Sequence, residues 1–281
     1  MKKISFLLLF TVSFVFGLDI TLKTNKVSNA RCFLLKSNED GSRYVAFEGK
    51  RYYFFPTKND YEHKFYALVP VNYYSKPHSS KLVAVVKKDG KKFYKSFAVR
   101  IVDGKYKSEK LRVAPSKAKF NKKQRARIKR ETKEAMKIYK TITPTCYWSE
   151  PFSYPMNSKI TSAFGNKRLF NGSLKSYHSG TDFRAKTGTP IYATNSGKVV
   201  LVKNRYFAGN SVLLDHGEGI YTGYYHMSRF KVKKGEMVEK GQLLGLAGAT
   251  GRVTGPHLHF STRVGGVQVD PLQLLKLLNE I

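Results

Sequence analysis

Cysteine, tryptophan and acidic side chains are all scarce in this 281-residue chain, which has two Cys, one Trp and 19 Asp and Glu. The two cysteines, Cys32 and Cys146, do not form a CxxC pair, so the sequence does not predict a cysteine-ligated metal site. In an oxidising compartment they could form one disulfide, and the sequence leaves open whether they do.

The shortage of acidic residues leaves a large excess of positive charge. Lys and Arg number 51, and the formal net charge is +32. Such a charge calls for an anionic partner, which could be nucleic acid, an anionic membrane surface or an acidic polymer. Composition alone does not choose among these three classes.

Long hydrophobic runs are also missing, apart from ISFLLLFTVSFVF at residues 4–16. This run is short for a membrane span, follows Lys2 and Lys3, and precedes Gly17, as in a secretory signal peptide. We therefore expect a signal peptide over residues 1–17, with an uncleaved N-terminal anchor as the alternative. Either way the protein is exported to the periplasm or cell envelope. Export argues against a nucleic-acid partner and favours an acidic wall polymer, with a weak contact to anionic membrane lipid as a further expectation.

Residues 18–115 are rich in Tyr, Phe and Val and are punctuated by turn residues. Hairpin turns are predicted at Glu48-Gly49-Lys50, Asp89-Gly90 and Asp103-Gly104, each between runs typical of β-strands. This part is therefore expected to form a small antiparallel β domain with a basic outer face.

A basic linker helix is expected within residues 116–146. Residues 116–142 contain no Gly or Pro, and Asn121 followed by Gln124 resembles a capping box. The apolar positions form a narrow stripe, so we expect one face to dock on a domain rather than on a membrane; the stripe consists of Ile128, Ala135, Ile138 and Ile142.

Residues 147–281 return to short β segments separated by glycine turns, and a helix is expected only in PLQLLKLLNEI at residues 271–281. The predicted fold class is thus mainly β: an N-terminal β domain, a linker helix and a C-terminal β domain. No internal repeat or low-complexity tract is present, and a monomer is the default expectation.

Five of the seven histidines fall within this C-terminal part. His63 and His78 lie outside it, among lysines and turn residues, where surface or turn roles are expected. His216 precedes a Gly-x-Gly turn, where we expect a hydrogen bond to backbone. His226 follows an aromatic run and, taken alone, would be a partly buried core histidine.

The other three histidines occur in patterns that suit a metal site. His178 lies four residues before Asp182, an even spacing that would put both side chains on one face of an extended segment. His257 and His259 have the same relation at a spacing of two. Both imidazoles could approach one ion, or one could bind it while its neighbour serves the chemistry.

In combination these motifs resemble the lysostaphin-type zinc endopeptidases, the LytM group of peptidoglycan hydrolases. The resemblance covers about residues 150–272 and rests on ITSAFG, HSGTDF, GTPIYATNSGKVV, GNSVLLDHGEGIYTGYYHMS, VKKGEMVEKGQLLGLAGATG and TGPHLHF. It implies a LytM-type β-sheet peptidase domain over residues 147–281. The segment FGNKRLF departs from the family's more compact FGxR spacing, which leaves the role of Arg168 open.

The resemblance also implies roles for five residues. His178, Asp182 and His259 would bind one zinc ion, and His226 and His257 would be catalytic. Two imidazoles and one carboxylate leave a coordination position open for water, which zinc makes acidic enough to ionise near neutral pH. The two remaining imidazoles could shuttle protons or stabilise negative charge on oxygen. No HExxH motif is present, so the glutamate base of that unrelated class is not expected.

The substrate implied by the resemblance is peptidoglycan, cut at the D-alanyl–meso-diaminopimelate cross-link in cell-wall remodelling and cell-shape control. A D,D-carboxypeptidase activity at the same zinc is a related expectation. The alternatives are an inactive wall-binding module that activates another hydrolase, and an exported adhesin or lipid-binding protein. The N-terminal domain would either bind the wall or cover the groove with an acidic side chain at the open zinc position.

Overall fold

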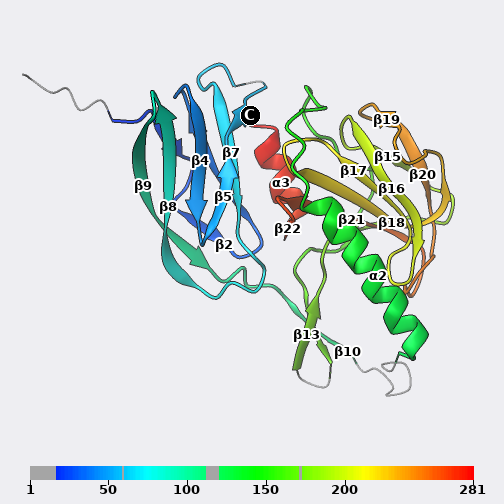
Figure 1. The fold of residues 1–281 in the computed structure, drawn as a ribbon. Coiled ribbons are helices and arrows are strands. Elements are labelled where there is room, and N and C mark those ends of the chain that lie inside the picture. Colours follow the sequence, from blue (N-terminus) through cyan, green and yellow to red (C-terminus); the bar gives the residue numbers. More distant parts are fainter. Residues whose placement is uncertain (1–16, 59, 112–119, 171–172) are drawn as a thin grey trace, which may run out of the picture.

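The computed structural model describes residues 17–58, 60–111, 120–170 and 173–281. Apart from Gly17, the signal peptide expected at residues 1–17 lies outside these ranges. The fold is mainly β, as predicted, with one group of sheets in the N-terminal part and a large sheet in the C-terminal part (Figure 1). No helix among the described residues is long and apolar enough to span a membrane.

Two sheets make up the N-terminal part. The first has the order β1-β3-β7-β6; its strands are Ile20–Leu22, Cys32–Ser37, Phe65–Pro70 and Phe55–Pro56. The second has the order β2-β9-β8-β4-β5; its strands are Lys26–Ser28, Lys91–Val102, His78–Lys88, Ser42–Phe47 and Lys50–Tyr53. Pairing is antiparallel as expected, except that β2 runs parallel to β9. Buried side chains from both sheets form one core, including Phe33, Leu35, Val45, Val69 and Leu82.

Two of the three predicted hairpin turns are present. Glu48-Gly49 and Asp89-Gly90 connect paired strands, and all four residues have positive φ, as a type I′ turn requires. The turn predicted at Asp103-Gly104 is wrong. The chain there leaves the sheet, and Gly104 instead allows close approach of the Tyr106 ring, into which a Cβ would collide.

The strand that follows, β10 (Ser108–Leu111), pairs with a C-terminal segment instead. It runs parallel to β12 (Lys167–Phe170), which pairs with β13 (Ser173–Tyr177). These three strands form a small sheet that lies at the lower edge of the view in Figure 1.

The C-terminal part is built on one large sheet of ten strands. Its main path is β11-β14-β21-β18-β17-β16-β19; these strands are Ile160–Ser162, Thr181–Arg184, His257–Val264, Ile220–Phe230, Gly209–Asp215, Gly197–Arg205 and Met237–Val238. The other three strands pair alongside this path; they are β15 (Pro190–Tyr192), β20 (Leu243–Ala247) and β22 (Val267–Val269).

The expected C-terminal helix is α3 (Pro271–Leu278), with Asp270 as its N-cap. It lies between the two groups of sheets (Figure 1). Gln273 accepts from the backbone N–H of Cys32 at 3.2 Å and donates to its carbonyl at 3.1 Å, so the helix is tied to β3. One hydrophobic core runs across the boundary and contains Leu34, Tyr66, Leu68, Leu258 and Leu274 among others.

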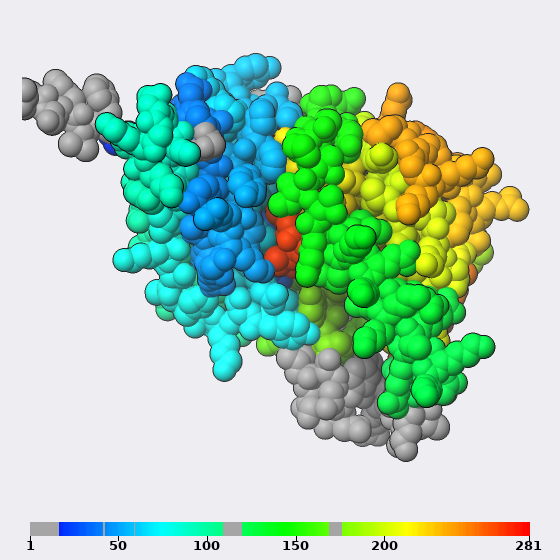
Figure 2. Space-filling view, viewed as in Figure 1, coloured from blue at the N-terminus to red at the C-terminus, as the bar shows by residue number. Residues whose placement is uncertain are grey.

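The basic helix α2 (Lys122–Tyr139) is shorter than the predicted 116–146. Its capping box between Asn121 and Gln124 is present as predicted. The predicted apolar stripe is confirmed in part, because Ala135 is buried and Ile138 packs against the same core, whereas Ile142 lies beyond the helix end and is 42% exposed. The fully buried side chains of the helix are Glu131, Ala135 and Tyr139, spaced four residues apart. Figure 2 shows α2 lying across the surface of the C-terminal strands.

Both cysteines are free thiols, so the disulfide that the sequence left open is not formed. Cys32 is buried in β3, and this burial raises the pKa of its thiol. Cys146 is partly buried, and its Sγ lies 3.1 Å from the carbonyl of Trp148.

His216 is fully buried under the large sheet. Its Nδ1 lies 2.7 Å from the carbonyl of Ser196, the backbone hydrogen bond that the sequence predicted, and its Nε2 lies 2.8 Å from the Thr222 hydroxyl. Burial disfavours the charged imidazolium and lowers the pKa of His216 to about 4.

We expect His216 to make the fold sensitive to acid. Because the unfolded histidine takes up a proton near pH 6.5 and the folded one only near pH 4, its stabilisation is complete above pH 6.5 and declines as the pH falls to 4. At about 1.4 kcal/mol per pKa unit, the loss is about 3 kcal/mol. Denaturant unfolding of the metal-free protein between pH 7.5 and 4 should therefore give a flatter profile for His216→Asn than for wild type. Parallel profiles would contradict this assignment.

Candidate metal centre and active site

Three adjacent strands, β14, β21 and β18, carry most of the predicted site. In the register, Asp182 on β14 is directly opposite His259 on β21, and Tyr225 on β18 is opposite His259 from the other side. His257 lies two residues earlier on β21, opposite Arg184. The sheet therefore fixes the relative positions of the carboxylate and two imidazoles through backbone hydrogen bonds.

His178 reaches the same place by a different route from the one that the sequence suggested. It does not share a strand with Asp182, because β13 ends at Tyr177 and β14 begins at Thr181. The chain bends between them, and Gly180 makes the bend fit: a Cβ there would collide with the carbonyl of Phe260 and lie 2.7 Å from the His259 ring. A turn, rather than the alternation of side chains along a strand, therefore brings His178 and Asp182 together.

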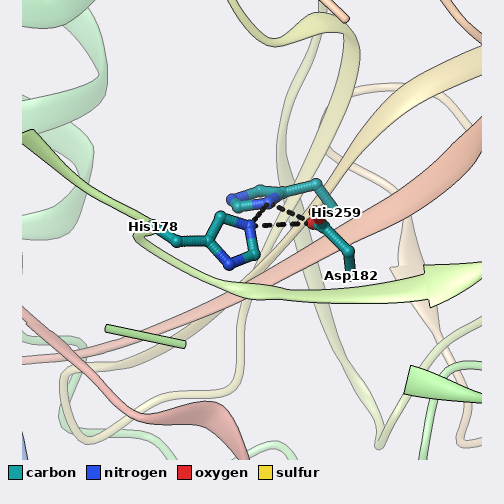
Figure 3. A group of neighbouring side chains, drawn as sticks. All are labelled: His178, Asp182 and His259. Carbon is teal, nitrogen blue, oxygen red and sulfur yellow. Dashed lines mark hydrogen bonds and ion pairs between the residues drawn. The ribbon is translucent and has the colours of Figure 1, made fainter. Parts of the chain in front are cut away.

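The three side chains predicted as ligands point at one another (Figure 3). Nε2 of His178 lies 2.9 Å from Oδ1 of Asp182 and 3.0 Å from Nδ1 of His259, and this Nδ1 lies 2.7 Å from the same carboxylate oxygen. Within the described ranges, these three residues form the group able to hold a metal ion, and no carboxylate of the N-terminal part joins it.

The hydrogen bonds around His178 favour a cation at this point. Its Nδ1 lies 2.8 Å from the carbonyl of Ala163, which can only accept, so the ring proton belongs on Nδ1. Nε2 faces the carboxylate of Asp182 at 2.9 Å, so a cation at this point, either a proton or a metal ion, is shared between the two side chains. Two nitrogens and one oxygen are also ligands that zinc accepts, with a fourth position left open.

The protonation states suit metal binding. Burial by itself raises the pKa of Asp182, but the hydrogen bonds and charges of His178 and His259 outweigh it and hold that pKa well below its ordinary value. Burial also lowers the pKa of His259. A carboxylate and a neutral imidazole are the forms that coordinate metals.

His226 lies beside this group in an unusual backbone conformation. Its φ is 61°, in the left-handed region that a histidine rarely adopts, and the pairing of β18 becomes irregular just after it. The backbone N–H donates to the carbonyl of Ala208 and Nδ1 lies near that of Thr250, each at 2.9 Å. These contacts turn the imidazole towards His257, whose ring centroid is 4.9 Å away.

His226 and His257 both have an Nδ1 that faces a carbonyl. For His257 it is the carbonyl of Gly255, at 2.9 Å, and its Nε2 lies 3.8 Å from Oδ1 of Asp182. Each ring thus keeps its proton on Nδ1 and leaves Nε2 able to accept one. Burial and then the charge of His259 lower the pKa of His226 to about 4, so this ring is neutral at pH 7.

The structure thus brings together all five residues singled out by sequence, namely His178, Asp182, His226, His257 and His259. His216 lies elsewhere in the core, and Arg168 lies on β12, outside the three strands that carry the site.

Sequence reasoning missed an aromatic cluster that supports His178 from the N-terminal part. The ring of Tyr73 stacks on that of Tyr177 at 3.6 Å and 7°, and its hydroxyl donates to the carbonyl of Gly165 at 2.7 Å. Gly165 N–H in turn donates to the carbonyl of His178 at 2.8 Å. The only sequence signal was Tyr177 immediately before His178, because its partner lies about a hundred residues away in the chain.

Zinc content should separate the two histidines of the HxH motif. His259→Ala removes a ligand nitrogen and is expected to lose the metal. His257→Ala removes a ring anchored on a backbone carbonyl and is expected to keep it while losing catalytic rate. Metal analysis of both purified variants tests this, and zinc loss on substitution of His257 with retention on substitution of His259 would reverse the assignment.

Removal of the Tyr73 ring should weaken metal binding without touching a ligand. We expect Tyr73→Ala to lower zinc affinity about 10- to 100-fold, as is typical when support behind a ligand is lost. Tyr73→Phe keeps the stack and should lose less. Val99→Ala, in the separate N-terminal core, is a control for general loosening and should leave affinity unchanged. Competition titrations with a zinc indicator measure all three, and equal losses in Tyr73→Ala and Val99→Ala would refute the role of Tyr73.

Comparison with known proteins agrees with this geometry. The model of Peptidase family M23 matches residues 176–271. The chain is 45% identical over 123 residues to peptidoglycan DD-endopeptidase ShyA of Vibrio cholerae; this stretch is 43% of the chain and 29% of ShyA. The chain therefore spans less than a third of the length of that relative.

Solved structures give a similar result. A crystal structure assigned to peptidase M23 from Pseudomonas aeruginosa is 26% identical, with a TM-score of 0.69, and the match covers 88% of this chain and 94% of that one. The catalytic domain of lysostaphin from Staphylococcus simulans is 35% identical, with a TM-score of 0.38, over 43% of this chain and 93% of that domain. Through its C-terminal part, the chain belongs to peptidase family M23.

Proposed function

We propose that this protein is a zinc metalloendopeptidase that hydrolyses stem-peptide cross-links in peptidoglycan. One observation carries the proposal: three metal-ligand atoms converge beside two imidazoles that each have an Nε2 free to accept a proton. An inactive wall-binding module would not need the imidazoles of His226 and His257 beside the metal ligands. The alternative of a non-catalytic activator is therefore less well supported.

In the proposed mechanism His178, Asp182 and His259 hold the metal. When bound, zinc supplies a Lewis acid that polarises the scissile carbonyl and lowers the pKa of a water molecule. His226 and His257 handle the protons: an unprotonated Nε2 accepts one from the attacking water, and the resulting imidazolium can donate to the leaving amine. Before it gives up that proton, the same imidazolium can also stabilise negative charge on the carbonyl oxygen.

The proposed substrate is supported by the positive charge of the chain and by its similarity to ShyA. A chain of net charge +32 is suited to an acidic polymer, and peptidoglycan stem peptides carry free carboxylates. ShyA is named a peptidoglycan DD-endopeptidase. For this chain we propose the D-Ala–meso-diaminopimelate cross-link as the bond that is cut, with D,D-carboxypeptidase activity as a second reaction at the same site. The location would be the periplasm or cell envelope, and the role wall remodelling and control of cell shape.

We assign residues 18–115 as an accessory domain, 116–146 as the linker and 147–281 as the peptidase domain. Two contacts support a bracing role for the accessory domain, namely the stack of Tyr73 on Tyr177 and its hydrogen bond to Gly165. An occluding role would need an acidic side chain at the metal, and in the described part of residues 18–115 none joins the ligand group.

Digestion of purified sacculi tests the proposed reaction. Wild type should convert cross-linked dimers into monomers, and His257→Ala or a chelator should abolish this conversion. Release of free D-Ala from monomeric pentapeptides would show the carboxypeptidase reaction. Activity that survives chelation would refute the metal mechanism, and unchanged dimers with the zinc-loaded wild type would refute the endopeptidase.

A further inference from the structure

Arg252 lies in the loop that joins Gly248 to His257, directly before β21, the strand that carries His257 and His259. The loop is closed at its base, where His257 N–H donates to the carbonyl of Gly248 at 3.2 Å. The Arg252 side chain is exposed, and its guanidinium carbon lies 5.6 Å from the ring centroid of Phe120 and 5.8 Å from that of Phe207. The two rings also contact each other edge to face, at 5.6 Å and 81°.

This arrangement, which we call the Arg252 platform (Arg252, Phe120 and Phe207), is tied to the candidate catalytic histidine. Arg252 N–H donates to the carbonyl of Phe207 at 3.0 Å. The residue after Phe207, Ala208, accepts the backbone N–H of His226, and Thr250 accepts from the His226 ring. The platform is therefore held by the same two loops that orient His226.

The two loops approach so closely that glycine is required at their contact. A Cβ on Gly209 would collide with the carbonyl of Thr250, and one on Gly251 would collide with the backbone of Gly209. Both glycines have positive φ, 60° and 83°. Backbone packed against backbone leaves little freedom, so the position of the Arg252 side chain is set by a rigid support.

The charge of Arg252 has no acidic partner among the residues that the structure describes. Arg127 offers a contrast on the same face, because it lies over the ring of Tyr206 and also pairs with Glu131 at 2.6 Å. A guanidinium that packs on aromatic faces keeps its N–H edges available, and those edges match a carboxylate with two parallel hydrogen bonds. Exposed cations of the first turn of α2 lie nearby in the chain after Phe120 and add to the positive field; they are Lys122, Lys123 and Arg125.

We propose that the Arg252 platform binds a free carboxylate of the substrate's stem peptide and so sets the register of the peptide relative to the metal. This inference rests on the proposed peptidoglycan substrate and goes further in naming the group recognised and the residue that recognises it. Arg252 is a specificity-determining residue in this scheme, since it binds the substrate away from the bond that breaks.

The test compares acidic and neutral forms of one substrate. Cross-linked muropeptide dimers are prepared with their carboxylates free or converted to carboxamides. Wild type should lose about tenfold or more in kcat/KM on amidation, which is the effect expected for a charge-assisted hydrogen bond. Arg252→Gln should show a similar loss on the acidic dimer and little further loss on amidation. Arg252→Lys keeps the positive charge but loses the paired N–H groups that can form two hydrogen bonds to one carboxylate. Its kcat/KM on the acidic dimer should lie between those of wild type and Arg252→Gln.

Arg100→Gln is the matched control, because it removes one exposed positive charge from β9 in the N-terminal sheet. It should behave like wild type with both substrates. Equal losses in Arg100→Gln and Arg252→Gln would reduce the effect to general charge, and an Arg252→Gln variant as sensitive to amidation as wild type would overturn the proposal. Zinc content should be unchanged in Arg252→Gln, and loss of zinc would also overturn it.

Binding separates this proposal from the proposed function. Calorimetric titration with the same dimers, in the non-cleaving His257→Ala background, should show weaker binding of the acidic dimer when Arg252→Gln is added. If wild type cleaves no dimer but this difference is found, the endopeptidase assignment fails and the carboxylate site stands. If cleavage is found without this difference, the site fails and the endopeptidase stands.

Discussion

The constraint on which the rest of the site depends is the convergence of three electron-pair donors. Nε2 of His178, Oδ1 of Asp182 and Nδ1 of His259 lie 2.7–3.0 Å apart, close enough for one cation to contact all three. The fold must supply this closeness, and it does so in two ways. Direct pairing of β14 with β21 sets Asp182 opposite His259, and the bend that Gly180 permits brings in His178.

Backbone carbonyls then decide what each imidazole can do. Those of Ala163, Thr250 and Gly255 face Nδ1 of His178, His226 and His257, so Nε2 is the nitrogen of each ring that is not held by a carbonyl. Nε2 of the buried His178 faces Asp182 and His259, and the rings of His226 and His257 lie beside this group. The imidazole of the candidate ligand His178 and those of the candidate proton carriers His226 and His257 are therefore held in the same way. They differ in position, which is set by the backbone carbonyl that each ring contacts.

The N-terminal sheets take part in this support. They share a hydrophobic core with the C-terminal sheet and α3, and Tyr73 extends the contact to the segment that carries His178. These contacts are the reason for which we propose that this part of the chain braces the candidate metal centre.

Sequence alone singled out the five residues that the structure brings together, because their order and local motifs resemble one family closely enough to place each of them. It also predicted the mainly β fold, the capping box of α2 and two hairpin turns. Its failures share a physical cause. The Asp103-Gly104 turn, the buried face of α2 and the stack of Tyr73 on Tyr177 all depend on partners distant in the chain. His178 and Asp182 do lie side by side, as predicted, but for a different reason. They do not share one face of a strand; a bend at Gly180 brings them together.

We propose that one zinc ion is held by His178, Asp182 and His259, and that His226 and His257 stay outside its coordination shell. Crystals of the zinc-loaded full chain, measured on both sides of the zinc absorption edge, test it most directly. We expect a single anomalous peak within bonding distance, about 2.0–2.2 Å, of Nε2 of His178, Oδ1 of Asp182 and Nδ1 of His259. A peak bonded to His226 or His257, or no peak at this site, would contradict it.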